Sequence, residues 1–262
     1  MGDSMKILIT GATSGIGYAL ANKLFLRGHE VIITTHTIKQ ANLLRKKINK
    51  GIKVIKLDVT NKNDREKVKK LDVDVLINHA GVGVGGSISE IDMEKVRRNF
   101  EVNVFSSFEL LQIVLKQMLK KEKGKIFITS SLLGIMPMKF LGVYSATKSS
   151  IISLTTTLRK EIKMLNKNIS ISLIEPGAYY TGFNQIMLEN KYEWMEKKSY
   201  FKDYLDEIRE NEKRTFDFLE KKNYDSIVNK IIDAVESDNP KFIIRAPFTQ
   251  VLGIKMYELF FK

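Results

Sequence analysis

Cysteine is absent from this sequence of 262 residues, and histidine occurs only three times. Without cysteine the chain can form no disulfide, no thiolate nucleophile and no cysteine zinc site. The three histidines form no cluster of metal ligands, so we expect no metal centre. The lack of disulfides fits a reducing compartment, and we expect the protein to be cytoplasmic.

Long apolar runs are also missing. No segment approaches the roughly 20 apolar residues that a membrane-spanning helix requires, and the N-terminal residues lack the basic and apolar regions of a signal peptide. We therefore predict no transmembrane segment. A composition with 44% hydrophobic and 28% charged residues is typical of globular proteins, and we expect residues 1–262 to form a single α/β domain.

Acidic residues are outnumbered, 30 against 43 basic ones, which gives a net charge of +13. Such an excess could serve binding to nucleic acid or to anionic lipid. However, the lysines are spread along the whole chain, and no basic cluster alternates with aromatic residues as in a strand-binding groove. We predict no nucleic-acid partner; the alternative, a basic nucleic-acid binder, would show an affinity that falls steeply with salt.

Short apolar segments alternate with amphipathic ones along most of the chain. The alternation indicates strands that are linked by helices, and hence a doubly wound parallel sheet with helices on both faces. The predicted strands cover residues 5–10, 30–35, 53–57, 74–78, 125–130, 169–174 and 241–244. The predicted helices cover residues 18–28, 38–49, 61–70, 92–120, 144–165 and 224–236.

A glycine-rich segment, TGATSGIG at residues 10–17, follows the first predicted strand at once and opens the first predicted helix. Gly11 permits a tight turn, while Gly15 and Gly17 let the backbone approach a pyrophosphate at the helix N-terminus. A plain glycine turn is the alternative interpretation. The position between strand and helix favours a dinucleotide site.

Tyr144 and Lys148 lie four residues apart in a predicted helix and therefore on one helical face. A nearby ammonium favours the phenolate and lowers the pKa of a tyrosine, which can then act as acid or base near neutral pH. Ser131, thirteen residues before Tyr144, follows the predicted strand 125–130. The spacing alone is weak evidence, because it arises by chance in many helices.

These segments occur together with Asn78-His79-Ala80-Gly81, Asn103 and Pro176-Gly177, in order and well spaced. With them the chain resembles the short-chain dehydrogenase/reductase family over residues 5–182, in the shorter branch with the Thr-Gly-x-x-x-Gly-x-Gly and Tyr-x-x-x-Lys motifs. His79 stands where most members have a second asparagine. The resemblance implies a Rossmann-type sheet of seven strands in the order 3-2-1-4-5-6-7 and a nicotinamide cofactor that carries the hydride.

The resemblance also implies residue roles. Tyr144 would be the general acid or base, Lys148 would bind the nicotinamide ribose, and Ser131 would stabilise charge on the substrate oxygen. Asn103 would hold a water in a proton relay. The implied cofactor contacts are Gly11, Thr13, Ser14, Gly15, Ile16, Gly17, Thr35, His36, Asp58, Val59, Asn78, Ala80, Gly81, Tyr144, Lys148, Pro176, Gly177 and Thr181. The expected substrate contacts are Ser131, Leu133, Met138, Tyr144, Tyr179, Phe183 and Met187.

The end of the second strand discriminates between the two dinucleotides. An acid there binds the ribose 2′-hydroxyl of NAD, whereas a basic residue accommodates the 2′-phosphate of NADP. Thr35 stands where the acid would be, and His36 stands where NADP enzymes of the family often have arginine. We therefore predict NADP(H) in preference to NAD(H).

Residues 178–222 interrupt the alternation and are rich in aromatic residues and methionine. In the family this place is the substrate lid, so we predict a helical lid and an apolar substrate; packing of lid helices onto the body would require the same composition. The tail 246–262 is apolar too. Its predicted role is packing against a second subunit, with lining of the substrate entrance and contact with a membrane surface as alternatives.

The predicted function is the interconversion of a ketone or aldehyde and an alcohol, in a homodimer or homotetramer that pairs through the helices 92–120 and 144–165. The first alternative is a non-catalytic NADP-binding sensor on the same fold, which loss of Tyr144 or Lys148 would have indicated; both are present. The second is an isomerase or dehydratase, which the glycine spacing disfavours.

Overall fold

The computed structural model describes residues 3–261. Seven strands form one parallel sheet in the order β3-β2-β1-β4-β5-β6-β7, as predicted. The direction of winding reverses between β1 and β4, and open α/β sheets bind ligands at the carboxyl ends of their strands at such a point. The strands are β1 (Lys6–Ile9), β2 (Glu30–Thr35), β3 (Lys53–Lys56), β4 (Val75–Asn78), β5 (Lys123–Thr129), β6 (Asn168–Pro176) and β7 (Ile243–Ala246).

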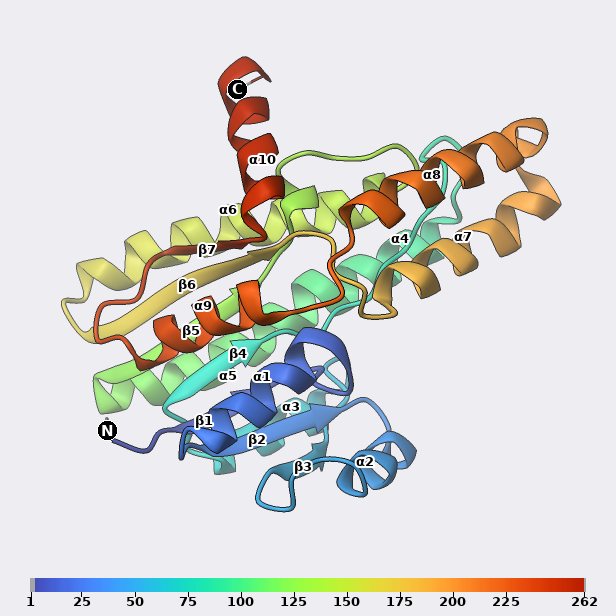
Figure 1. The fold of residues 1–262 in the computed structure, drawn as a ribbon. Helices are drawn as coiled ribbons and strands as arrows, with labels where there is room; N and C mark the ends of the chain where they lie inside the picture. The colour runs from blue at the N-terminus through green and yellow to red at the C-terminus, as the bar shows by residue number, and fades with distance from the viewer. Residues whose placement is uncertain (1–2, 262) are drawn as a thin grey trace.

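Helices cover both faces of the sheet (Figure 1). Side chains alternate between the faces along each strand, so Ile7 and Ile9 join one buried cluster and Leu8 joins the other. The helices against the first cluster are α1 (Gly15–Leu26), α2 (Ile38–Arg45) and α9 (Asp225–Glu236). Those against the second are α5 (Ser106–Lys121) and α6 (Gly142–Met164), while α3 (Lys62–Lys67) and α4 (Met93–Phe100) complete the set.

The predicted helix over 92–120 is not continuous. A π-helical segment, Glu101–Phe105, separates α4 from α5. Such segments often mark functional sites in helices. This one places Asn103 in the interior, with none of its surface exposed.

Residues 178–222 contain two helices, α7 (Phe183–Lys198) and α8 (Leu205–Leu219), which extend away from the sheet on the right of Figure 1. A fully buried lysine, Lys191 of α7, forms an ion pair with Glu212 of α8. The pair is further connected by the hydroxyl of Tyr192, which donates to the same carboxylate at 2.5 Å. The two helices therefore form one unit, joined through a buried polar network.

The apolar tail forms a helix, α10 (Phe248–Phe261), which rises from the body at the top of Figure 1. Arg245 of β7 connects α10 to the sheet, because it bonds both the buried Glu175 of β6 and, at 3.4 Å, Glu258 near the C-terminal end of α10. Ile254 packs with Leu132 in a small apolar cluster. Among residues 3–261, no helix has the length and apolar character that crossing a bilayer requires.

Candidate active site

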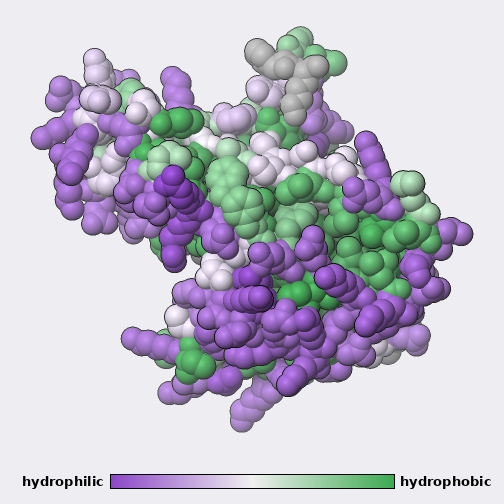
Figure 2. Space-filling model, turned by 180° about the vertical axis from the view of Figure 1, so that it is seen from behind, coloured by the Kyte–Doolittle hydropathy of each residue, from purple (hydrophilic) through white to green (hydrophobic). Residues whose placement is uncertain are grey.

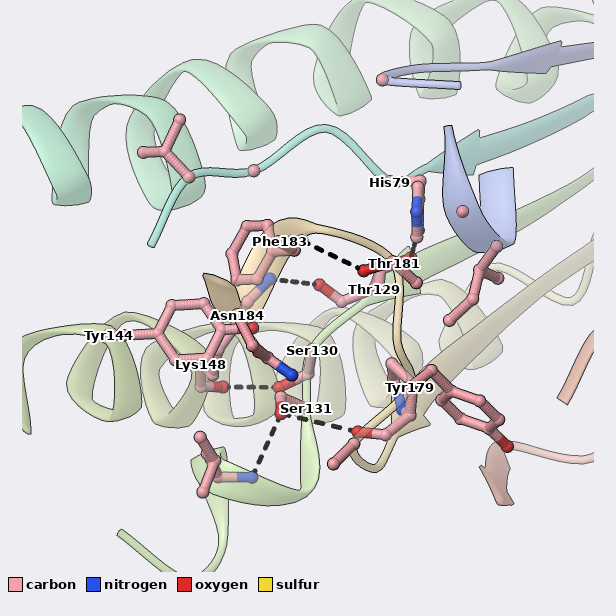
Figure 3. A pocket seen from close by; sticks show the side chains of 18 of the residues that line it. His79, Thr129, Ser130, Ser131, Tyr144, Lys148, Tyr179, Thr181, Phe183 and Asn184 are labelled. Atoms are coloured by element: carbon pink, nitrogen blue, oxygen red, sulfur yellow. Dashed lines mark hydrogen bonds between the residues drawn. The ribbon is translucent and has the colours of Figure 1, made fainter. Parts of the chain in front are cut away.

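A cavity of about 890 Å³ opens at the carboxyl ends of the strands. One end is formed by the glycine turn and the ends of β2 and β3, and the other by α6, the lid and α10. The elongated lining runs past both the glycine turn and Tyr144, which the sequence places 127 residues or more apart along the chain. Figure 3 shows the central part of this cavity.

The glycine turn after β1 has little space for side chains. A Cβ on Gly11, which has φ +67°, would lie 2.7 Å from the Cα of Ala80, and a Cβ on Gly15, with φ +57°, would lie 2.7 Å from Thr181. Thr10 fixes the neighbouring loop, because its hydroxyl accepts hydrogen bonds from the N–H groups of His79 and Ala80, both at 2.9 Å. Without side chains, the glycine backbone leaves room for a pyrophosphate, and the first turn of α1 holds no acidic residue that would repel this anion. The N–H groups at the start of α1 would donate to it.

Tyr144, Lys148 and Ser131 meet at the other end of the cavity (Figure 3). The ammonium of Lys148 lies 5.6 Å from the centre of the Tyr144 ring and donates to the carbonyl of Thr129 at 3.0 Å. Ser131 begins a short turn after β5, where its hydroxyl accepts from the N–H of Leu133 at 3.2 Å. Ser130, one residue earlier, instead donates to the carbonyl of Lys148 at 2.8 Å.

Burial is the main cause of the pKa shifts of Tyr144 and Lys148. It raises the pKa of Tyr144 to about 12, and the hydrogen bond with Ser131 offsets only part of that rise. Burial also lowers the pKa of Lys148 to about 8, because a low-dielectric site disfavours the charged form. We expected Lys148 to lower the pKa of Tyr144. In this structure the pKa is raised instead, and Ser131 is the group that favours the phenolate.

Asn103 lies behind the cavity wall rather than on it. Its Oδ1 accepts from the N–H of Val82 at 2.8 Å, and its Nδ2 donates to the carbonyl of Val82 at 2.9 Å and to Thr147 at 3.0 Å. The side chain thus fixes the loop that contains Gly81. A Cβ on Gly81 would lie 3.7 Å from the Lys148 ammonium, so this loop borders the reactive end of the cavity.

One of the cofactor contacts expected at the ends of β2 and β3 does not line the cavity. Thr35 is 1% exposed and donates to the carbonyl of Thr37, so it does not line the cavity. Thr34 and His36 do, because neighbouring side chains in a strand point to opposite faces. His36 Nδ1 lies 3.5 Å from a carboxylate oxygen of Asp58. Burial raises the pKa of Asp58, but hydrogen bonds from Thr60 and the nearby His36 outweigh it and lower that pKa.

Apolar side chains surround Tyr144. The ring of Phe183, the first residue of α7, lies 5.6 Å from the Tyr144 ring. Leu133, Met138 and Tyr179 line the cavity as expected. Met187 does not, because it is 1% exposed and packs with Leu141 and Phe216 between lid and body.

Most of the expected contact residues meet in this one cavity. The exceptions are Gly17, Thr35, Asn78, Asn103 and Met187, which lie behind its wall. Gly17 packs against Ala12 and His79, and Asn78 bonds Ser107. Among the described residues no group of three His, Cys, Asp or Glu side chains could hold a metal ion.

Several lining residues were not predicted individually. They include Thr34, Gln40, Arg98, Met136, Phe216, Phe218, Lys221, Thr249, Gln250, Gly253 and Ile254. Arg98 lies one helical turn before Val102 of the same wall, a spacing that could have revealed it. The last four belong to α10, so the tail does line the cavity, which was an alternative to the preferred role in subunit packing.

Two histidines are held by contacts with distant parts of the chain, His29 after α1 and His79 in the loop after β4. His29 is 7% exposed and accepts from the N–H of Met5 at 3.3 Å. His79 lines the cavity, and its ring bonds the Thr129 hydroxyl at 3.1 Å. Burial lowers the pKa of His79 to about 4, and the Lys148 charge adds to that effect.

The chain is similar to known short-chain dehydrogenases. The family model for short chain dehydrogenases matches residues 5–191. A probable short-chain type dehydrogenase/reductase, VdlC, from Helicobacter pylori is 34% identical over 190 residues, which cover 70% of this chain and 68% of that protein. The 3-ketodihydrosphingosine reductase of Bacteroides thetaiotaomicron is 34% identical over 183 residues, 68% of this chain and 65% of that protein.

Solved structures show the same fold. The closed form of serine dehydrogenase complexed with NADP+ has 25% identity and a TM-score of 0.66, covering 74% of this chain and 80% of that one. A protein from Burkholderia phymatum, solved in complex with NAD, has 21% identity and a TM-score of 0.80, covering 98% of this chain and 94% of that one. At this identity, the second likeness concerns the fold alone.

Proposed function

The chain belongs to the short-chain dehydrogenase/reductase family, and we propose that it is an NADP(H)-preferring oxidoreductase that interconverts a ketone or aldehyde and an alcohol. The observation that carries this proposal is that Tyr144, Ser131 and Lys148 converge at one end of a cavity whose other end is the glycine turn. A dinucleotide stretched between these ends would supply or accept the hydride. No comparison supports the alternative of a non-catalytic sensor.

The side chains divide the proton chemistry among them. During reduction, the hydroxyl of Tyr144 would donate its proton to the carbonyl oxygen of the substrate, and during oxidation its phenolate would accept a proton from the alcohol. Ser131, which favours the phenolate of Tyr144, would donate to the same oxygen and stabilise its developing charge. Lys148 would hold ribose hydroxyls and, when protonated, favour the phenolate. Asn103 would act from behind by positioning the loop at Val82.

The preference for NADP(H) is supported by the end of β2. His36 lines the cavity, and no acidic residue occurs between Glu30 and Asp58. An acid on β2 would repel a 2′-phosphate, whereas a histidine can donate to it. We propose Thr34 and His36, rather than Thr35, as the residues of β2 and its end that contact the ribose.

The proposed substrate is apolar. Leu133, Met138, Phe183 and Phe216 surround the Tyr144 end of the cavity, and cavities of this kind take ligands with large apolar parts. The relative from Bacteroides thetaiotaomicron is named for a long-chain lipid ketone, 3-ketodihydrosphingosine. A ketone with a long apolar chain is therefore the substrate class that we would test first.

We also propose a single domain of residues 1–262 in a cytoplasmic homo-oligomer, with residues 178–222 as its substrate lid. Figure 2 views the molecule from the side of α4, α5 and α6 and shows apolar side chains gathered over part of this face. Phe105 and Leu154 are 56% and 43% exposed there. Pairing of two copies through α5 and α6 would cover them.

The first test is a fluorescence titration with NADPH and with NADH, followed by turnover of aromatic and long-chain ketones. We expect NADPH to bind more tightly, and Tyr144→Phe to retain that binding while turnover falls by about 10²–10⁴-fold. Preference for NADH would overturn the interpretation of His36 but not the proton chemistry. Absence of binding by either nucleotide would overturn the proposed function.

A further inference from the structure

We infer that helix α10 rests on a lipid surface and that apolar substrate passes from this surface into the cavity. Five large apolar side chains, spaced to fall on one helical face, are exposed along α10. They are Phe248, Leu252, Met256, Leu259 and Phe260, exposed to 73%, 49%, 56%, 78% and 71%. We call them the apolar stripe. Contiguous exposed apolar surface of this kind marks an interaction site.

The opposite face of α10 is fixed to the body, so the helix cannot turn its stripe inward. Ile254 is 2% exposed, and the amide of Gln250 bonds Ala178 and Leu219, both at 2.8 Å. The helix has a single acidic residue, Glu258, which faces Arg245 of β7 at 3.4 Å. The outward face consequently presents apolar groups and Lys255, without negative charge. A helix whose exposed face is apolar and free of negative charge can bury that face in a membrane interface.

The stripe continues to the mouth of the cavity. Thr249 and Gly253 of α10 line the cavity one residue away from Phe248 and Leu252 of the stripe. Across the mouth, Ile186 of α7 and Phe218 of α8 line the same cavity while they are 60% and 84% exposed. An apolar molecule leaving a lipid surface at α10 would therefore meet apolar side chains all the way to Tyr144.

A second copy of the chain fits the stripe less well than a bilayer does. A large side chain has an area of about 150–250 Å². Because the five are between 49% and 78% exposed, together they present roughly 600 Å². A stable protein interface buries about 800 Å² on each partner, and a partner seated here would also cover the mouth between Phe218 and Gly253. A lipid surface has no area requirement and holds the class of substrate that we propose.

Vesicle flotation of the full chain tests this inference. The vesicles would contain phosphatidylcholine alone or phosphatidylcholine with phosphatidylglycerol, at low and high salt. The test variant is Leu252→Glu with Met256→Glu, which places two charges in the stripe one turn apart. The matched control is Met164→Glu with Leu165→Glu at the end of α6, where the two side chains are 84% and 49% exposed.

We expect the wild type and the control to float with both kinds of vesicle and the stripe variant to lose binding by about tenfold or more. The inference is overturned if the wild type does not float or floats only with anionic vesicles at low salt. It is also overturned if the control loses as much binding as the stripe variant. It is also overturned if the stripe variant changes the oligomeric state in sedimentation, since the stripe would then face a second copy. The substrate route rests on the proposed function, but flotation needs no turnover. NADPH binding, measured on the same samples, shows whether the proposed function fails independently of the membrane binding.

Discussion

Asn103 holds the backbone of Val82 at both of its polar groups, by accepting from its N–H at 2.8 Å and donating to its carbonyl at 2.9 Å. This pair connects the π-helical segment between α4 and α5 to the loop after β4, at the rear of the reactive end of the cavity. A residue with both a donor and an acceptor on a short side chain is required for such a contact, which asparagine satisfies.

Asn103→Ala would leave the N–H and carbonyl of Val82 without their side-chain partner in the interior. We expect it to lower the free energy of unfolding by about 2–4 kcal/mol, because buried polar groups without a partner are desolvated with no hydrogen bond in return. Urea denaturation would measure this. Asn42→Ala on the exposed face of α2 is the control and should stay within about 0.5 kcal/mol of the wild type. Equal stability of the two variants would contradict a positioning role for Asn103.

The fold and the meeting of Tyr144 with Lys148 could be predicted because their signals are local. A glycine turn between strand and helix, or a tyrosine one helical turn before a lysine, is complete within a few residues. The failures depend on contacts that a sequence does not contain. Thr34, not Thr35, faces the cavity because a shift of one residue exchanges the two faces of a strand. Met187 is buried against Leu141 of the body and Phe216 of α8, a contact between segments that lie far apart in the sequence.

That α10 lines the cavity could not be predicted either, because this too depends on contacts between distant parts of the chain. The apolar tail predicts a buried or docking segment, and only the contacts of Gln250 and Ile254 place its base beside the lid. Likewise, nothing near His29 in the sequence indicates burial; Glu236, which lies 3.3 Å from its ring, is far along the chain.

His36→Asp tests the dinucleotide preference at the residue that the geometry identifies. We expect NADPH to bind at least about tenfold more weakly, since a carboxylate would replace a donor beside the 2′-phosphate, while NADH binding should change less. Nicotinamide fluorescence would give both affinities. Thr35→Val is the matched control, because its side chain faces away from the cavity and should leave the ratio of affinities unchanged. A ratio altered only in the Thr35 variant would reverse the assignment.

His79 makes the stability of the fold sensitive to acid. Its pKa is about 4 in the folded chain, against 6.5 when unfolded, so the unfolded chain binds more protons between these values and stability falls as the pH drops from 6.5 to 4. From pH 7 to pH 5 the group should remove about 2 kcal/mol. His79→Asn abolishes this contribution, and urea denaturation at the two pH values would show a smaller loss than in the wild type.

The control for that measurement is Asn42→Ala on the exposed face of α2, which removes no titratable group and should retain the wild-type pH dependence. If both variants followed the wild-type curve, groups other than His79 would account for the acid sensitivity of this protein.

Gln250 connects the two ends of the lid. Its Oε1 accepts from the N–H of Ala178, where the lid begins, and its Nε2 donates to the carbonyl of Leu219, where α8 ends. Gly177 lies so close that a Cβ there would be 2.1 Å from Oε1. Gln250→Leu would remove both bonds and, with a side chain of similar volume, leave the packing of α10 in place. We expect the lid to open more often, because its ends would keep the backbone hydrogen bonds of Lys221 with Ala178 and Tyr180 but lose the two bonds of Gln250.

The expected result is a KM for a long-chain ketone that is raised several-fold, with a smaller change in kcat and an unchanged affinity for NADPH, whose site begins at the far glycine turn. Trypsin should cleave the lid faster, at Lys197 or Lys198, because cleavage follows the population of the open form. Gln250→Glu retains the acceptor and loses only the donor, so it should fall between Gln250→Leu and the wild type. Gln112→Leu on the exposed face of α5 should alter none of these quantities. Loss of NADPH affinity in Gln250→Leu would mean that the residue supports the whole cavity rather than the lid alone.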